Sequence, residues 1–150
     1  MYRDNLARAN STVSESSAEA NFQNFRRAHL AATQPKWPTQ VLAKMTDLLS
    51  LQPGWDSYRA PALRHDAAMF AMTVLQNVMT SRTPEPSVVP SATGGVQLEW
   101  HDAGVDLEIH VLAPYEGEVW WRDHATGTEH ASDLGTDLSV LHEPISKLSA

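Results

Sequence analysis

Cysteine is absent from this sequence of 150 residues, and basic side chains are scarce in its C-terminal part. The lack of cysteine excludes a disulfide scaffold, a thiolate zinc site, an iron–sulfur cluster and a cysteine nucleophile. No stretch approaches the roughly 18 uninterrupted apolar residues that span a bilayer. The N-terminal segment also lacks the apolar region of a secretory signal. We therefore expect a cytoplasmic protein with no membrane segment.

Hydrophobic residues make up 42% of the chain, which is enough for a real core in one domain of this length. Residues 1–17 are polar and rich in serine and asparagine, so we expect a disordered or weakly ordered tail. Residues 18–150 are expected to form a single α+β domain. Its helical part spans 18–83, its sheet spans 84–133, and a short C-terminal helix spans 134–150.

Apolar residues at steps of three and four predict helices in the first half of the chain. A helix capped by Ser16 or Ser17 is expected to place Phe22 and Phe25 on one face. It either packs at the edge of the domain or docks a partner, which leaves a homodimer through this helix open. Thr136 resembles the N-cap of the C-terminal helix.

Two further helices are expected to back the sheet. The first begins at Pro38 and ends before Pro53-Gly54, because proline suits a first helical turn and glycine a helix end. The second begins at Pro61 and runs to about residue 80. The short link between them predicts an αα-hairpin or an αα-corner.

After Pro86 the hydrophobic period changes from 3.6 to 2, which predicts strands. Residues 87–90 should form an edge strand because Pro90 cannot donate to a sheet. Residues 96–101 and 105–111 alternate as two strands of a hairpin, and 119–122 form the next strand. Residues 123–133 are a polar excursion or a final hairpin arm. The expected fold places N-terminal helices on one face of a mainly antiparallel β-meander of about four strands.

The register of the central hairpin follows from the requirement that apolar residues on both strands share a face. The apolar residues have even numbers in the first strand and odd numbers in the second, so the residue numbers of two paired positions must add up to an odd number. A two-residue turn at Asp102-Ala103 places Trp100 opposite Val105 and Leu98 opposite Leu107. The same register places Glu99 opposite Asp106 on the outer face.

Several short motifs occur in order over residues 45–122. They are Gly54-Trp55-Asp56-Ser57-Tyr58 with a following Pro61, then Pro86-Ser87-Val88-Val89-Pro90, Gly94-Gly95 and Leu98-Glu99-Trp100. This string resembles a family of small, largely uncharacterised bacterial proteins that share the pattern G-W-D-x-Y, P-x-V-x-P and G-G-x-x-L-E-W before an acidic alternating strand. The resemblance implies a shared fold and no assigned chemistry. That family is expected to carry glycine where this chain has Ser57.

The motif residues have physical roles that we expect to be structural. Asp56 can accept backbone N–H bonds shortly before a helix. Trp55 and Tyr58 are expected to wedge between the helix pair and the sheet. Gly94 and Gly95 allow a turn with positive φ. The structural set is Gly54, Trp55, Asp56, Tyr58, Gly94, Gly95 and Trp100.

Charge is distributed unevenly along the chain. Residues 85–150 contain twelve acidic residues and only Arg122 and Lys147 as basic ones. Such a field repels nucleic acid and favours basic partners or cations, of which we take a basic protein partner as the leading hypothesis. The outer face of the central hairpin carries much of this charge, and exposed aromatic side chains beside it would anchor a partner. The predicted partner-binding residues are Glu99, His101, Asp106, Glu108, His110, Tyr115 and Trp120.

The pattern predicts no enzyme and no cofactor, because nucleotide-binding and nucleophile motifs are absent. It predicts no metal site, because same-face neighbours along one strand stand roughly 6.6 Å apart, too far for many ligands to converge. The leading hypothesis is a non-enzymatic interaction module that binds a basic partner, such as an inhibitor or antitoxin-like protein of a bacterial or mobile-element system. One alternative is a metal-assisted hydrolase with ligands among Glu99, His101, Glu108 and His110. A second acid–histidine cluster lies at Asp123-His124 and Glu129-His130. The other alternative is a structural subunit that self-associates through the Phe22/Phe25 helix.

Overall fold

The computed structural model describes residues 19–28 and 35–150. The chain divides into two units, residues 1–34 and residues 35–150. Within the first unit, residues 19–28 are helical, and Phe22 and Phe25 are 59% and 68% exposed. The predicted tail at 1–17 and the predicted cap of this helix lie outside the described residues. No helix in the described part is long and apolar enough to cross a membrane.

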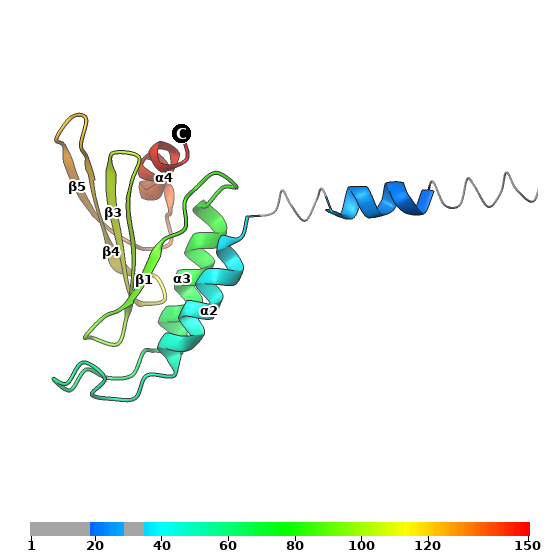
Figure 1. Ribbon diagram of the computed structural model, residues 1–150. Coiled ribbons are helices and arrows are strands. Elements are labelled where there is room, and N and C mark those ends of the chain that lie inside the picture. The colour runs from blue at the N-terminus through cyan, green and yellow to red at the C-terminus, as the bar shows by residue number, and fades with distance from the viewer. Residues whose placement is uncertain (1–18, 29–34) are drawn as a thin grey trace, which may run out of the picture. The chain divides into compact units, whose positions relative to one another are not determined.

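Residues 35–150 have an α+β fold, as the sequence predicts (Figure 1). Two long helices come first, α2 (Trp37–Leu49) and α3 (His65–Val78). Pro38 lies in the first turn of α2, where its missing N–H costs no hydrogen bond. Figure 1 shows α2 and α3 side by side on one face of the sheet.

The predicted start of α3 at Pro61 is wrong, because the helix begins at His65. The residue before it, Arg64, is extended, and its N–H donates to the carbonyl of Gly94 at 2.9 Å. This bond ties the chain to the β1–β2 loop and delays the helix by one turn. Residues 50–64 therefore form a long connection between α2 and α3 and not the short hairpin link that we predicted.

The connection folds on itself around Asp56. One carboxylate oxygen, Asp56 Oδ1, accepts the N–H groups of Tyr58 (2.8 Å) and Ala60 (2.9 Å), which lowers the pKa of Asp56 below its ordinary value. Gly54, with φ of 84°, donates its N–H to the Ala60 carbonyl and closes the loop. The carboxylate thus caps a loop and not a helix.

The aromatic residues of this loop do not behave alike. Trp55 is partly buried, and its indole N–H donates to the Pro61 carbonyl at 3.0 Å. Tyr58 is 87% exposed, so the expectation that it wedges between helices and sheet is wrong. Ser57 has φ of 66°, a conformation that glycine adopts without strain.

The sheet has five antiparallel strands in the order β1-β2-β3-β4-β5, one more than the four that we expected. They are β1 (Ser87–Pro90), β2 (Val96–Asp102), β3 (Val105–Ala113), β4 (Glu116–Asp123) and β5 (Glu129–Asp133). The fifth strand comes from the polar excursion after β4. Proline-containing β1 forms one edge, as predicted, and β5 forms the other.

The predicted register of the central hairpin is wrong by two positions. Trp100 lies opposite Leu107, not Val105, and Glu99 lies opposite Glu108, not Asp106. The turn consists of Ala103 and Gly104 and not of Asp102-Ala103.

Turn chemistry explains this difference. Both turn residues have positive φ, 50° at Ala103 and 72° at Gly104. Two-residue hairpin turns of this kind favour glycine at the second position, which the predicted turn would have given to alanine. A shift of two positions keeps every side chain on its face. The predicted inner face is therefore confirmed, with Leu98 and Leu107 fully buried.

The core lies between the inner face of the sheet and the helices. It combines side chains of α2, α3 and α4 with alternating residues of the strands. Trp100 is buried there, and its indole N–H donates to the Pro84 carbonyl at 2.8 Å. Gly94 has the predicted positive φ, at 88°. All helices of residues 35–150 lie on the same face, so the opposite face of the sheet is uncovered by them (Figure 1).

The chain ends with a 3-10 turn (Ser139–Leu141) and the short helix α4 (His142–Leu148). Pro144 lies within the first turn of α4, where it does not break the helix, and Thr136 is not the N-cap. Two contacts fix α4 to the domain. The hydroxyls of Thr83 and Ser149 lie 2.7 Å apart in the interior, and Lys147 Nζ lies 2.9 Å from Asp123 Oδ2.

Candidate functional site

The outer face of the sheet is the surface of β2–β5 that points away from the helices. Strand alternation places on it side chains that are at least partly exposed, because no helix of residues 35–150 covers them. It holds six carboxylates and one guanidinium. We define the outer face by Gln97, Glu99, His101, Asp106, Glu108, His110, Glu118, Trp120, Arg122, Glu129, Ala131 and Asp133.

Two glutamates lie directly opposite each other at the centre of this face. Glu99 on β2 pairs in register with Glu108 on β3, an unfavourable arrangement for like charges. The Gln97 amide nitrogen lies between them and donates to Glu99 Oε1 (2.7 Å) and Glu108 Oε2 (3.3 Å). His110 Nε2 lies 3.4 Å from the same Glu108 oxygen. A neutral amide and an imidazole thus offset the repulsion in part.

A second group centres on Asp106. Its two carboxylate oxygens lie 2.9 Å from His101 Nδ1 and 2.8 Å from His124 Nε2. The hydrogen bond with Asp106 raises the pKa of His101, and the bonds with both histidines lower the pKa of Asp106. Glu99 Oε2 lies 4.0 Å from His101 Nε2, which connects this group to the central pair of glutamates.

The two aromatic residues of the predicted site lie in different places. Trp120 is on the outer face, between Glu108 on β3 and Ala131 on β5. Its neighbour Trp121 is buried on the inner face and stacks on His130, with ring centroids 4.2 Å apart. Tyr115 lies in the β3–β4 turn and contacts Phe70 of α3 (centroids 4.9 Å), so it is not next to Trp120.

The second acid–histidine cluster does not form. Asp123 pairs with Lys147, which lowers the pKa of the carboxyl, while His124 turns to Asp106. Glu129 pairs with Arg122 at 3.6 Å, and His130 stacks on an indole. Across residues 19–28 and 35–150, no three histidine, aspartate or glutamate side chains are grouped so that they could hold a metal ion. The metal-assisted alternative therefore has no candidate centre in the described residues.

Sequence reasoning missed two acidic members of the outer face, Glu118 and Asp133. The signal for Glu118 was available, because alternation from Trp120 places it on the same face. Asp133 could not be assigned without knowing that residues 129–133 form β5. Gln97 was assigned to the face, but its role as a bridge depends on the register that the turn decides.

Comparisons of this chain with protein-family models, curated proteins and solved structures found no match. The resemblance carried by the G-W-D-x-Y and G-G-x-x-L-E-W motifs stays a prediction. The function of the chain must therefore be argued from the outer face itself. The outer face is an open surface with an excess of negative charge. It carries histidines that are hydrogen-bonded to carboxylates, and one indole.

Proposed function

We propose that this protein is a non-enzymatic interaction module that binds a basic protein partner through the outer face of its sheet. The observation that carries the proposal is the charge of that face: six carboxylates gathered on four adjacent strands with only Arg122 to oppose them. Complementary charge of this kind speeds association and selects for a basic surface.

The internal bonds of the face support a binding role over a catalytic one. Three of the carboxylates, Glu99, Asp106 and Glu108, are held in position by hydrogen bonds without being sealed from water. Their partners are Gln97, His101, His110 and His124. General acid–base catalysis favours a concave, dry setting, which the central glutamates lack, since Glu99 and Glu108 side chains are 25% and 32% exposed. One setting for such a module is an inhibitor or antitoxin-like protein that covers the basic surface of its target.

The test is a binding experiment with charge reversal. The immobilised protein is exposed to an extract of its source cells, and captured basic proteins are purified and titrated against it. We expect affinity to fall at least about tenfold between about 50 mM and 300 mM salt, because screening weakens exposed charge pairs. Glu99→Lys combined with Glu108→Lys should abolish binding while circular dichroism and thermal unfolding show a folded chain.

A matched control separates the face from net charge. Asp47→Lys combined with Glu143→Lys makes the same change in charge on exposed positions of α2 and α4. We expect this variant to keep binding within about threefold of the unmodified chain. Binding that is indifferent to salt, or equally weakened by both double variants, would remove the support for the proposal.

A second candidate function has its own observation. The exposure of Phe22 and Phe25 on helix 19–28 supports a subunit that self-associates through this segment. The two roles are compatible, because self-association would use residues 1–34 and the binding of a basic partner would use the sheet of residues 35–150.

A further inference from the structure

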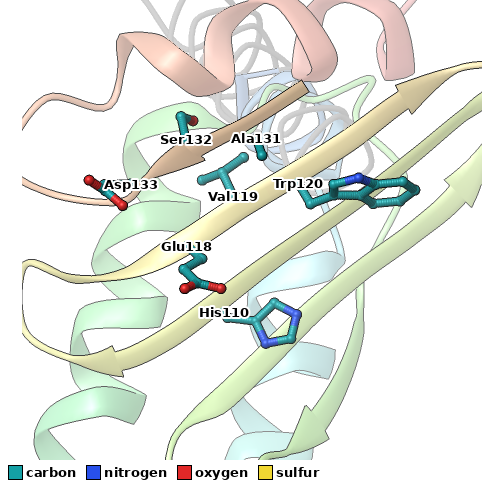
Figure 2. Close-up of a pocket in the computed structure, with 7 residues that line it drawn as sticks. All are labelled: His110, Glu118, Val119, Trp120, Ala131, Ser132 and Asp133. Carbon is teal, nitrogen blue, oxygen red and sulfur yellow. The ribbon is translucent and has the colours of Figure 1, made fainter. Parts of the chain in front are cut away.

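A groove crosses the outer face over β3, β4 and β5. Its volume is about 530 Å³. The small side chain of Ala131 lies opposite Trp120 in the register, which leaves space beside the indole. Figure 2 shows the indole of Trp120, the carboxylate of Glu118 and the imidazole of His110 at this groove. The lining residues are His110, Glu118, Val119, Trp120, Ala131, Ser132 and Asp133.

Two carboxylates in the groove differ from the others on the outer face. Glu118 and Asp133 lie directly opposite each other on β4 and β5, and both are exposed. Within the described ranges neither has an ion pair, whereas Glu129 pairs with Arg122 and Asp106 with two histidines. Cross-strand like charges are unfavourable, so a cation placed between this pair would relieve their repulsion.

The indole supplies a surface that selects the kind of cation. Trp120 is two residues from Glu118 on the same strand, so the two side chains leave the same face from backbone positions roughly 7 Å apart. A guanidinium is planar, stacks on aromatic rings and donates up to five N–H bonds in a fork that matches carboxylates. A lysine ammonium is a compact, strongly hydrated charge that makes poorer contact with the flat face of an indole ring.

We propose that this groove binds one arginine side chain of the basic partner, with the guanidinium stacked on Trp120 and paired with Glu118 and Asp133. This inference rests on the proposed function, which supplies the partner. It assigns the anchor of that interaction to the β4–β5 side of the face, away from the Glu99/Glu108 pair on β2 and β3.

The direct test uses short probes on the full chain. Acetylated and amidated Gly-Arg-Gly, Gly-Lys-Gly and Gly-citrulline-Gly are titrated against protein labelled with nitrogen-15, and the indole N–H signal of Trp120 is followed by NMR. Trp120→Phe assigns that signal among the five tryptophans. We expect saturable shifts with the arginine peptide, at least threefold weaker binding of the lysine peptide and none of the uncharged citrulline peptide. Equal shifts with citrulline, or no shift with arginine, would overturn the inference.

Paired variants test whether the groove or the general field binds the probe. Glu118→Gln with Asp133→Asn removes the two unpaired charges, and Glu116→Gln with Glu129→Gln removes two exposed charges from the same strands. We expect the first variant to weaken the arginine peptide about tenfold and the second less than threefold. Equal weakening by both would assign the binding to net charge alone.

The two proposals can fail separately. If a basic partner is lost on reversal of Glu99 and Glu108 but is unaffected by Glu118→Gln with Asp133→Asn, the interaction module stands and the arginine groove is overturned. If the arginine peptide binds as expected while no captured protein shows salt-dependent binding, the groove stands and the proposed function fails.

Discussion

At the scale of single residues, His101 is the side chain whose charge state changes the outer face most directly. Asp106 and Glu99 face it on the sheet, Glu108 adds its field, and Asp106 is shared with His124 and lies opposite Arg122. The hydrogen bond with Asp106, together with the charges of Asp106, Glu99 and Glu108, raises the pKa of His101 above its ordinary value of 6.5. When His101 takes up a proton, the outer face loses part of its negative charge.

The unfolding free energy of the domain should depend on pH because of the hydrogen bond between His101 and Asp106. The pKa of His101 is raised, so its contribution is complete below 6.5 and is lost as pH rises through the raised value. The pKa of Asp106 is lowered, so its contribution is complete above 3.8 and is lost as pH falls through the lowered value. We therefore expect His101→Gln to lower the unfolding free energy more at about pH 5.5 than at about pH 8.5.

Denaturant unfolding at the two pH values measures this difference, and NMR titration of the imidazole gives the midpoint for His101. Asp106→Asn is the matched control. It removes the largest cause of the raised pKa of His101 and leaves the fields of Glu99 and Glu108, so the difference between the two pH values should shrink. An unchanged difference in the Asp106→Asn background would assign the pH dependence to another group.

At the scale of elements, the sequence predicts most of what periodicity encodes and little of what turns decide. The helices α2 and α3, the alternating strands β2 and β3, and their buried face follow from spacing alone. The register and the late start of α3 do not follow from spacing, and the fifth strand follows only as one of two alternatives for residues 123–133. They depend on Gly104 in the hairpin turn, on the bond from Arg64 to Gly94, and on pairing of a polar segment with β4.

The candidate site follows the same division. The alternation of side chains along a strand predicts that Glu99, His101 and Trp120 share the outer face, because alternation does not depend on the register. Alternation could not place Tyr115, because it lies in the β3–β4 turn, where its exposed ring contacts Phe70. Gln97 and His124 gained their roles only through contacts across strands, which a single sequence does not reveal.

Strand β4 is expected to tolerate no side chain larger than that of glycine at Gly117. A Cβ added to Gly117, at the start of β4, would collide with the carbonyl oxygen of His110 on β3. We expect Gly117→Ala to lower the unfolding free energy by about 2 kcal/mol, because the strands must move apart. Denaturant unfolding measures this loss.

Gly135 is the matched control for that substitution, because nothing lies within 4 Å of a Cβ added there. Gly135→Ala should change stability by less than about 0.5 kcal/mol. Equal effects of the two substitutions would mean that the close approach of β3 and β4 at Gly117 does not limit the sheet.

At the scale of the whole molecule, the apolar core cluster of the described residues and the outer face of the sheet both belong to residues 35–150. The apolar core cluster of the described residues runs from Trp37 to Leu148 and includes none from helix 19–28. All members of the outer face also lie in this unit. The N-terminal unit is therefore expected to add an interaction without adding to the core.

Deletion of residues 1–34 tests both parts of that expectation. Calorimetry should give an unfolding midpoint within about 2 °C of the full chain, because no described core residue is removed. Sedimentation equilibrium should show self-association of the full chain that the deletion abolishes. Phe22→Ser with Phe25→Ser in the full chain should abolish it equally, since burial of these exposed rings would drive it. A full chain that sediments as a monomer would contradict self-association, and a midpoint lowered by more than about 5 °C would place part of the core in the deleted segment.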